Sequence, residues 1–413
     1  MQNGFAQVDT TFFKKQPINY STFMNLLGKN NLGYIAEKFN LNIAEANILS
    51  AGILPDPELS FGYFDNGQQR MKMGNGFGSS INWTLELGRK RKARMDLANN
   101  EYELTKYLLQ DYFRNLRAEA TLFFLSAILK KQLLDVQINS YQKMYQIARS
   151  DSIRFKLGSI TELDARQSKL EAGNMLKDVY QAEAEWKMML ANLSVFIGKN
   201  QNDTLLLPQG NFTNFERNFT LQELIITAQN NRADLLAALQ NKNVSASVLK
   251  LAEANRVIDL GISGGITYAS YVINIIAPTP SFVQMNLGIS VPLKFSNNRP
   301  GELKAAYYKT LQADAQYKQI EIQIQNEVTQ AYFNYLAQKK QIEQFNTGLL
   351  SEAKAILDGK IYSYQRGETS LIEVLNAQRT YNEIQISYFQ TLYNYAAALV
   401  ELERVAGIWD INF

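Results

Sequence analysis

Apolar residues recur at helical spacing along most of the chain, and they alternate one by one with polar residues in four short segments. The two longest helical stretches span about 89–156 and 301–365. Neither contains a proline, which would break a helix interior at a cost of about 3 kcal/mol. A heptad series runs through the second stretch, at Val328, Tyr335, Ile342, Leu349 and Ile356, with Ile324, Ala331 and Phe345 as partners. This spacing predicts a long coiled-coil helix.

Shorter helices are predicted over about 19–50, 160–199, 220–256 and 369–408. Each of the two long helices would measure roughly 100 Å, at about 1.5 Å per residue. A globular core of ordinary size does not hold such rods, so they must pack along each other or along neighbouring chains. On their own, the helices favour a coiled-coil scaffold.

A pair of alternating segments precedes each long helix, over about 57–66 and 77–88 and again over about 258–272 and 281–295. One face of these predicted strands is small and polar. The other face is apolar, with Leu59, Phe61, Tyr63, Ile81, Trp83, Leu85, Leu87, Leu260, Ile262, Ile266, Tyr268, Val283, Met285, Leu287, Ile289, Val291 and Leu293. A half-buried soluble sheet fits this alternation as well as a membrane barrel does, but segments of about 10 residues match membrane strands.

Four strands cannot close a barrel, and an open edge in lipid would leave backbone groups unpaired. A membrane barrel therefore requires several copies of the chain. Three copies would supply twelve strands, which is enough for a water-filled channel. The long segments Asp65–Asn75 and Ile273–Pro280 between the strands fit the outer loops of such a barrel.

The composition narrows the possible functions. The 413 residues include no histidine and no cysteine, which excludes a Ser-His-Asp triad, a cysteine nucleophile and ordinary zinc or iron–sulfur sites. We therefore expect no enzyme, no metal site and no cofactor. The formal net charge of +3 argues against a nucleic-acid partner. The longest strongly apolar run, Leu122–Leu129, is far shorter than the roughly 20 residues of a membrane helix.

Two local clusters have simple interpretations. A basic cluster follows the second predicted strand, where it would meet lipid phosphates at the inner leaflet; it consists of Arg89, Lys90, Arg91, Lys92 and Arg94. Met71 and Met73 could offer thioethers to Cu(I), but ordinary loop residues are the simpler interpretation.

The two halves of the sequence repeat the same elements at an offset of 209 residues. In the first half Phe155-x-x-Gly158 precedes Leu163 and Asp164, and in the second half Tyr364-x-x-Gly367 precedes Ile372 and Glu373; Gly198 corresponds to Gly407. We predict two structural repeats, 1–208 and 209–413. In each half the first glycine lies where a long helix must reverse, and the acid lies in the first turns of the returning helix, where it favours the helix N-terminus.

The stretches RFKLGSITELDARQSKLE and YSYQRGETSLIEVLNAQRTYNE resemble the paired YxxGxxxxLDxLxAQ-type motifs of the outer membrane factor family, the TolC-like efflux ducts. The similarity extends over nearly the whole chain, including LPDPELSFGYF and LELGRKRKAR. The resemblance implies a mainly α-helical homotrimer with a twelve-strand outer-membrane barrel, a long helical periplasmic barrel and a mixed equatorial region near 200–220. It also implies contacts with a periplasmic adaptor and with an inner-membrane pump of the RND type.

The same resemblance implies roles for residues at the helix reversals. Gly158, Ser159, Gly367 and Glu368 correspond to the tips that dock the adaptor. The gate and aperture correspond to Asp164, Tyr364, Thr369, Glu373 and Asn376. Thr369 stands where well-known members have an arginine, and Asn376 replaces a second acid of the entrance. Closure would therefore depend on neutral hydrogen bonds and packing.

The sequence thus predicts a passive export duct in the outer membrane of a Gram-negative bacterium, with a coiled-coil scaffold as the alternative. The segment KNNLGYIAEKFNLNIAEANI is similar to the heavy-metal cation branch of the family, which concerns the cargo of the pump. Three copies of Glu373 would meet at a narrow point, where their repulsion raises their pKa values. Asp164 would lie nearby or anchor Tyr364 through a hydrogen bond.

Overall fold

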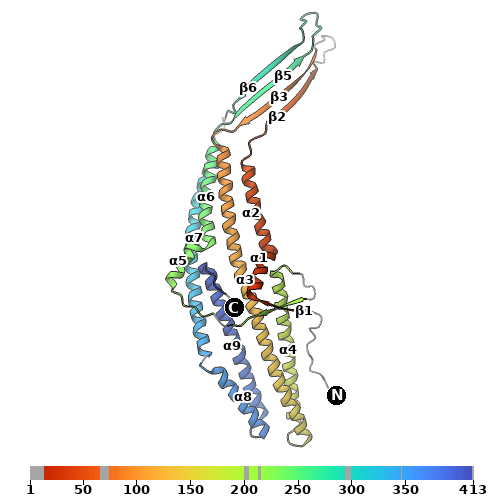
Figure 1. The fold of residues 1–413 in the computed structure, drawn as a ribbon, viewed down its shortest axis with the longest axis vertical. Helices are drawn as coiled ribbons and strands as arrows, with labels where there is room; N and C mark the ends of the chain where they lie inside the picture. The colour runs from red at the N-terminus through yellow and green to blue at the C-terminus, as the bar shows by residue number, and fades with distance from the viewer. Residues whose placement is uncertain are drawn as a thin grey trace. The chain divides into compact units, whose positions relative to one another are not determined.

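The computed structural model describes residues 14–65, 74–199, 204–212, 215–293, 299–345 and 347–411. The chain divides into two compact units, whose elements are labelled in Figure 1. The sheet unit comprises Phe39–Leu108 and Asp234–Ile320, and the tip unit comprises Met1–Lys38, Leu109–Ala233 and Glu321–Phe413. Each unit draws on both halves of the sequence. The two predicted repeats are therefore not two separate compact bodies, and the duplication itself stays a prediction.

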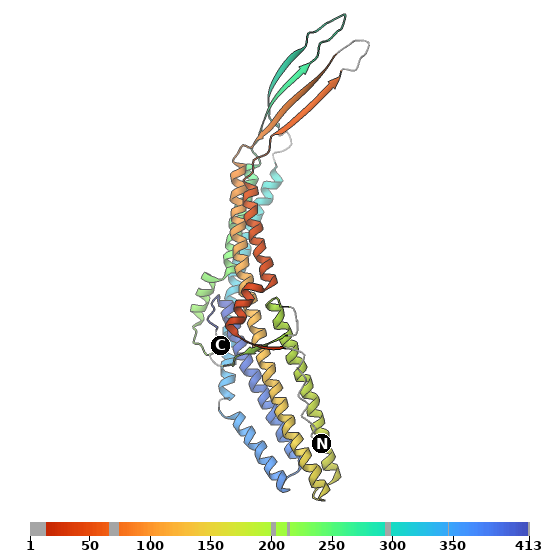
Figure 2. The same cartoon turned by 45° about the vertical axis from the view of Figure 1, so that its right-hand side comes forward.

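The sheet unit contains an antiparallel sheet of four strands in the order β2-β3-β5-β6 (Figures 1 and 2). The strands are β2 (Glu58–Asp65), β3 (Asn75–Leu85), β5 (Leu260–Ala269) and β6 (Phe282–Ser290). The two inner strands, β3 and β5, come from different halves of the sequence and pair with Trp83 opposite Ile262. Four strands in one chain agree with the predicted number.

The register of the strands sorts the apolar side chains onto one face. Leu59 lies opposite Ile81, Trp83 opposite Ile262, and Ile262 opposite Ile289. The apolar side chains on this face are exposed; Phe61 is 78% exposed and Leu287 is 93% exposed. The alternation predicted from the sequence is therefore present, with its apolar face uncovered by the rest of the sheet unit.

Helical segments complete the sheet unit. They are most of α2 (Leu32–Ala51), the first part of α3 (Lys90–Lys156), nearly all of α6 (Ala233–Ala254) and the first part of α7 (Pro300–Phe345). The Asn100 Nδ2 atom donates to Ser247 Oγ over 2.8 Å and so joins α3 to α6. An ion pair of 2.8 Å between Lys242 and Asp314 joins α6 to α7.

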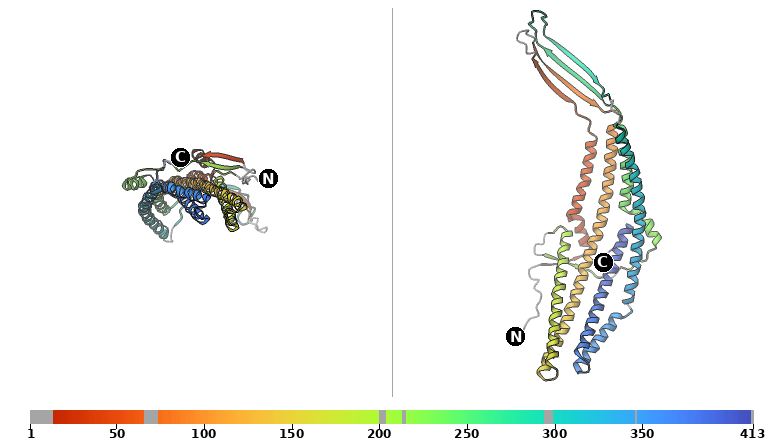
Figure 3. Two further views of the ribbon diagram at one scale, coloured as in Figure 1. Left: turned by 90° about the horizontal axis from the view of Figure 1, so that it is seen from below. Right: turned by 180° about the vertical axis from the view of Figure 1, so that it is seen from behind.

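The tip unit consists of helices with one pair of parallel strands. The remaining parts of α3 and α7 join α1 (Tyr20–Asn30), α4 (Glu162–Phe196), α5 (Leu221–Asn231), α8 (Leu349–Arg366) and α9 (Leu371–Ala406). Strands β1 (Lys14–Asn19) and β4 (Thr204–Gln209) pair in parallel and lie on one side of the helices in the view from below (Figure 3). The core contains the fully buried side chains of Phe23, Phe124, Leu125, Leu190, Leu193, Val400 and Leu402. Among the described residues, no helix has the length and apolarity needed to cross a membrane.

Two helices that were expected to be continuous are each divided. The range 19–50 forms α1 and α2, because Asn31 leaves the helical conformation with φ −63° and ψ 117°. Its Oδ1 atom accepts the Tyr34 N–H over 2.9 Å, and its Nδ2 atom donates to the Phe196 carbonyl over 2.9 Å. The range 220–256 forms α5 and α6 around Arg232, whose Nη1 atom donates to the Val405 carbonyl over 3.2 Å. Tertiary hydrogen bonds thus stabilise both breaks.

The predicted long helix over 301–365 is also divided. Helix α7 ends at Phe345 and α8 begins at Leu349. Gly348 precedes α8 with a left-handed φ of 107°, a conformation that favours glycine. The long helix of the second half is therefore α7 followed by α8, whereas its counterpart α3 runs unbroken for 67 residues.

The heptad prediction holds only before this break. Its buried members are Ile324, Val328, Ala331, Tyr335 and Ile342. Beyond the break Leu349 and Ile356 are 46% and 58% exposed, so the heptad series is wrong there. The buried face of α8 is instead formed by Ala353, Leu357 and Tyr364. Gly348 changes the helical phase, and a single heptad frame cannot continue across it.

Candidate functional site

Helix α3 ends in a turn built around Gly158, which has a φ of +72°. The Gly158 N–H donates to the Phe155 carbonyl over 2.9 Å, and the Ser159 N–H donates to the Arg154 carbonyl over 2.8 Å. These bonds satisfy carbonyl groups that the helix end leaves without partners. Ser159 is exposed at this reversal, one of the two predicted docking tips.

Helix α8 ends in the same way at Gly367, which has a φ of +80°. The Gly367 N–H donates to the Tyr364 carbonyl over 3.0 Å, and the Glu368 N–H donates to the Ser363 carbonyl over 2.9 Å. A Cβ atom added at Gly158 or Gly367 would meet no other atom within 4 Å. Glycine is therefore favoured there by the backbone dihedral and not by a lack of space for a side chain.

The two returning helices begin differently. Thr161 caps α4, because its hydroxyl oxygen accepts the Asp164 N–H over 3.1 Å. The Thr161 hydroxyl in turn donates to Asp164 Oδ2 over 2.7 Å. Ser370 at the start of α9 makes no side-chain cap bond. Asp164 therefore stabilises a helix start, which was the simpler interpretation of this acid.

A buried hydrogen bond links the two reversals. The Tyr364 hydroxyl of α8 donates to Asp151 Oδ1 of α3 over 3.0 Å. Asp151 is fully buried, and Tyr364 is 7% exposed. The carboxylate that anchors Tyr364 is thus Asp151, which contradicts the second of the two alternatives given for Asp164.

Arg154 completes this contact on the α3 side. Its Nη1 atom lies 3.8 Å from Asp151 Oδ1 and 3.4 Å from the Tyr364 carbonyl, to which it donates. Its guanidinium carbon lies 5.2 Å from the centre of the Tyr364 ring, within the range of a cation–π interaction. A small cavity of about 230 Å³ opens beside the three side chains. One tyrosine thus carries most of the polar contact between α3 and α8 near the tip.

Apolar packing surrounds this polar contact. The cluster draws on α3, α4, α8 and α9 and contains Met144, Ile147, Ala148, Ala172, Met175, Tyr364, Leu371, Val374 and Leu375. Burial raises the pKa of Asp151 above its usual value, against the opposing hydrogen bond from Tyr364 and the charge of Arg154. Burial and the neighbouring Asp151 carboxyl raise the pKa of Tyr364. The hydroxyl therefore stays protonated and able to donate.

Glu373 lies on the returning helix α9, and its carboxylate already has an ion-pair partner. Glu373 Oε2 accepts from Lys360 Nζ over 2.6 Å, and both side chains are almost half exposed. The hydrogen bond from Lys360 lowers the pKa of Glu373. Crowded carboxylates from three copies would raise it, and that expectation stays a prediction. Of the other predicted gate residues, Thr369 is half-buried and Asn376 is exposed.

Sequence reasoning missed Asp151 and Lys360. The two residues occupy equivalent positions, because their numbers differ by the offset of 209 that relates the two halves. Aligning ionisable residues alone at that offset would have found them. In each half, an ionisable residue lies seven positions before the glycine of the turn and contacts another helix. Asp151 contacts Tyr364 of α8, and Lys360 contacts Glu373 of α9.

The basic cluster after β3 divides into paired and unpaired cations. Lys90 is buried and forms an ion pair of 2.6 Å with Asp259, and Arg94 binds Glu86 through two hydrogen bonds. These two side chains are engaged within the sheet unit and are not available to lipid, contrary to expectation. Arg89, Arg91 and Lys92 are exposed, as the expectation requires.

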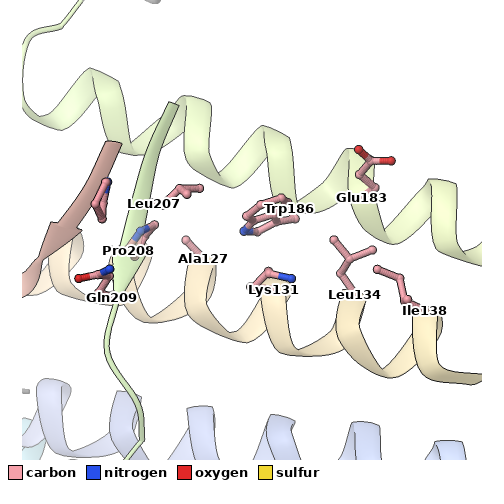
Figure 4. Close-up of a pocket in the computed structure, with 10 residues that line it drawn as sticks. Ala127, Lys131, Leu134, Ile138, Glu183, Trp186, Leu207, Pro208 and Gln209 are labelled. Atoms are coloured by element: carbon pink, nitrogen blue, oxygen red, sulfur yellow. The ribbon is translucent and has the colours of Figure 1, made fainter. Parts of the chain in front are cut away.

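A separate cavity of about 460 Å³ lies between α3, α4 and β4 (Figure 4). Trp186 faces Lys131 there, with the ammonium 5.4 Å from the ring centre. Lys131 pairs with Asp135, and Glu183 pairs with Lys187. Because these charges are already satisfied, the cavity offers a ligand no free charged group from Lys131 or Glu183. Within the described ranges, no group of three or more acidic side chains could hold a metal ion.

Comparison with known proteins decides what this architecture is. Residues 224–408 match the family described as outer membrane efflux protein. The cobalt-zinc-cadmium resistance protein CzcC of Cupriavidus metallidurans is 21% identical over 394 residues, which cover 95% of this chain and 90% of that protein. The outer membrane protein TolC of Vibrio cholerae is 21% identical over 389 residues, covering 88% and 85%. The chain is thus similar to TolC-like outer membrane efflux proteins over most of its length.

Solved structures agree with this assignment at the level of the fold. The crystal structure of CusC has a TM-score of 0.76 at 17% sequence identity, with 94% of this chain and 92% of that chain covered. The predicted fold of one chain, mainly helical with a four-stranded sheet, is thereby confirmed. These similarities support a location in the outer membrane with a helical periplasmic part, and the two relatives are named as a resistance protein and an outer membrane protein.

Proposed function

We propose that three copies of this efflux protein assemble into one export channel. The observation that carries the proposal is the four-stranded sheet, which has one apolar exposed face and two edge strands, β2 and β6, without a further partner in the described chain. Unpaired strand edges are not tolerated in lipid, and three sheets joined edge to edge would form a closed barrel of twelve strands. The polar face of the sheet would then line the channel.

The duct works as the outermost part of an export system with a periplasmic adaptor and an inner-membrane pump of the RND type. The exposed turns at Gly158–Ser159 and Gly367–Glu368 support docking of the adaptor, because both lie at the same end of the tip unit (Figure 2). Movement of α8 relative to α3 opens the entrance. This movement requires the Tyr364–Asp151 hydrogen bond to break, so Tyr364 acts as a latch.

Glu373 shapes the aperture by its charge. Three copies would bring three carboxylates together, each partly balanced by its Lys360. Glu373→Gln should reduce cation selectivity and block by multivalent cations in planar-bilayer recordings, whereas Lys360→Gln should increase both. Glu352→Gln, an exposed acid in the first turn of α8, serves as the control. If Glu373→Gln and Lys360→Gln leave both properties unchanged, Glu373 acts only as a helix-start residue.

The cargo is a divalent metal cation. This part rests on the similarity to the cobalt-zinc-cadmium resistance protein CzcC over 95% of the chain. The efflux protein has no histidine or cysteine, so selection of the metal belongs to the pump and the duct conducts passively.

The proposed export function can be tested by deleting the gene in its host and complementing the deletion with plasmid-borne variants. The wild-type gene should restore growth on cobalt, zinc or cadmium, and the chain should fractionate with the outer membrane. If the gene restored resistance to lipophilic drugs but not to metals, the proposed cargo would be wrong, and the proposed export channel would stand. If the chain fractionated with soluble proteins, the proposal of an export channel would be wrong.

A further inference from the structure

A hollow of about 580 Å³ lies on the apolar face of the sheet, at the end of β3 that leads into α3. Its wall is formed mainly by Ile53, Leu54, Ile81, Trp83, Ile262 and Gly264. The large apolar side chains of this wall are well exposed, for example Ile53 at 61% and Trp83 at 40%. The segment after α2 thus passes over the face of the sheet and leaves an apolar hollow that the chain itself does not fill.

The polar groups inside this hollow are few. The Trp83 Nε1–H, which would otherwise require a partner, donates to the Pro55 carbonyl over 2.9 Å. Aliphatic carbon dominates the remaining wall. A hydrocarbon chain fits such a wall, because it buries apolar surface without leaving a hydrogen bond unmade.

The position of the hollow in the sheet argues against a second copy of the chain as its occupant. Strands β3 and β5 line it, and both are inner strands of the order β2-β3-β5-β6. Neighbouring copies would join at the outer strands β2 and β6. The hollow therefore opens onto the surface that faces lipid in the proposed barrel.

An acidic residue lines the hollow, and a basic residue at the start of α3 contacts its wall. Arg94 Nη2 donates to the Ile53 carbonyl over 3.1 Å, which ties the start of α3 to the wall of the hollow. Arg91 precedes Arg94 by three residues and so shares its side of the helix. Arg91 and Lys92 are exposed and have no ion-pair partner among the described residues. The exposed Asp56 carboxylate lies on the lining of the hollow.

We propose that the hollow is a specific site for a phospholipid with a zwitterionic ethanolamine headgroup. One acyl chain lies against Ile81, Trp83 and Ile262. The phosphate binds Arg91 and Lys92, and the ammonium donates to Asp56. This inference rests on the proposed function, because it requires the apolar face of the sheet to lie in a membrane.

Two variants separate the apolar part of the site from its charged part. Gly264→Leu fills the hollow, and its Cβ atom would approach only Leu287, at an ordinary 3.5 Å. Its control is Gly62→Leu, which adds the same side chain to open space on β2, outside the lining of the hollow. Arg91→Gln with Lys92→Gln removes the cations. Its control is Lys309→Gln with Lys318→Gln, two exposed lysines of α7.

The measurement is native mass spectrometry of the purified assembly, delipidated and then titrated with defined lipids in detergent. Phosphatidylethanolamine should remain bound at one molecule per chain in the wild type and in both controls. Gly264→Leu should abolish this binding, and loss of both cations should weaken it about tenfold. Diacylglycerol with the same acyl chains should not remain bound, because it has no phosphate.

Three results would overturn the proposal. They are equal retention in Gly264→Leu and wild type, equal retention of diacylglycerol and phosphatidylethanolamine, and retention of phosphatidylglycerol as strong as that of phosphatidylethanolamine. Metal resistance and outer-membrane fractionation of the same variants are measured in parallel. If both stay normal in the wild type while the wild type retains no phosphatidylethanolamine, only the lipid site is wrong; if fractionation fails in the wild type, the proposed function fails first.

Discussion

At the scale of single residues, one buried hydrogen bond stabilises the packing of α8 on α3. A buried carboxyl group is costly to the fold unless hydrogen bonds satisfy it. Asp151 is fully buried, and Tyr364 is its hydrogen-bond donor from the neighbouring helix α8. Any movement that separates α8 from α3 must leave this carboxyl group without that donor. The pair therefore favours the closed arrangement of the two helices.

Tyr364→Phe removes the donor and keeps the ring. We expect this change to destabilise the packing of α8 on α3 by about 1–3 kcal/mol, because the buried Asp151 carboxyl group loses one of its hydrogen-bond donors. Channel conductance in planar bilayers should rise, and amides near the tip should exchange hydrogen faster. Tyr362→Phe is the matched control, since the hydroxyl of Tyr362 is exposed and accepts only from Arg366 of its own helix. Equal conductance of Tyr364→Phe and wild type would contradict the latch.

A second buried acid fixes the end of the chain. Glu403 of α9 is fully buried, and its Oε2 atom accepts the Asp410 N–H over 3.0 Å. Arg217 binds Asp410 over 3.2 Å, while Arg117 of α3 and Tyr20 of α1 lie close enough to interact with Glu403. Burial raises the pKa of Glu403 from the usual 4.5 to about 8.

The stability of the tip unit should therefore depend on pH. Because the folded-state pKa is raised, the contribution of Glu403 is fully present below its unfolded pKa and is lost as pH rises through about 8. The thermal unfolding temperature should fall between pH 5 and pH 9, by a larger amount in wild type than in Glu403→Gln. Glu401→Gln removes an acid that is 41% exposed and paired with Arg404, and should keep the wild-type slope. A wild-type slope in Glu403→Gln would refute this assignment.

At the scale of elements, the two helix reversals combine a left-handed backbone conformation, which glycine adopts without strain, with open surroundings. An L-residue in the left-handed region costs about 1–2 kcal/mol, and asparagine tolerates it best. Gly158→Val should therefore weaken the turn, whereas Gly158→Asn should keep it. Both place a side chain on the exposed tip, so both should reduce adaptor binding and efflux while assembly in the membrane persists.

Adaptor pull-down and metal resistance measure this effect. Gly173→Val is the control, because Gly173 lies within α4 without a positive φ and an added Cβ there also meets open space. Normal efflux with Gly158→Asn and lost efflux with Gly158→Val would assign the glycine to the turn alone. Normal efflux with both variants would remove Gly158 from the docking surface.

The sequence predicted most elements but not where helices break. Alternation located all four strands of the sheet, because one face of each strand is consistently apolar. The two asparagines before Arg232 signal a helix end only weakly, and the break also depends on a hydrogen bond to Val405, which is distant in the sequence. The pair β1–β4 was missed for a similar reason. It joins segments about 190 residues apart, and neither shows a long alternating pattern.

The candidate site was predicted only in part. Tyr364 and both turn glycines follow from motifs, since a left-handed turn after a helix requires glycine. Asp151 was missed because a carboxylate in a helical sequence is expected to be exposed, and only tertiary packing buries it. Lys360 likewise depends on its contact with α9.

At the scale of the whole molecule, the decisive question is how the sheet closes. The outer strands β2 and β6 are separated by the two inner strands and cannot pair with each other in one chain. In a closed barrel, β6 of one copy would pair with β2 of the next. Strands along the sheet alternate in direction, so this new pair would be antiparallel.

Cysteine pairs across the proposed junction test this closure directly, and the absence of native cysteine leaves no competing thiol. Ser60→Cys on the polar face of β2 would be combined in turn with Gln284→Cys, Asn286→Cys or Ser290→Cys on the polar face of β6. Opposite residues of an antiparallel pair lie about 4.5–5.5 Å apart at Cβ, which is near the range a disulfide can bridge. One of the three combinations should therefore give covalent trimers on non-reducing gels.

Ser60→Cys with Ser80→Cys is the control, because these residues face each other within one chain and should cross-link without any change in size. Efficient cross-linking in the control, together with monomers from all three test pairs, would mean that β2 and β6 of neighbouring copies do not meet.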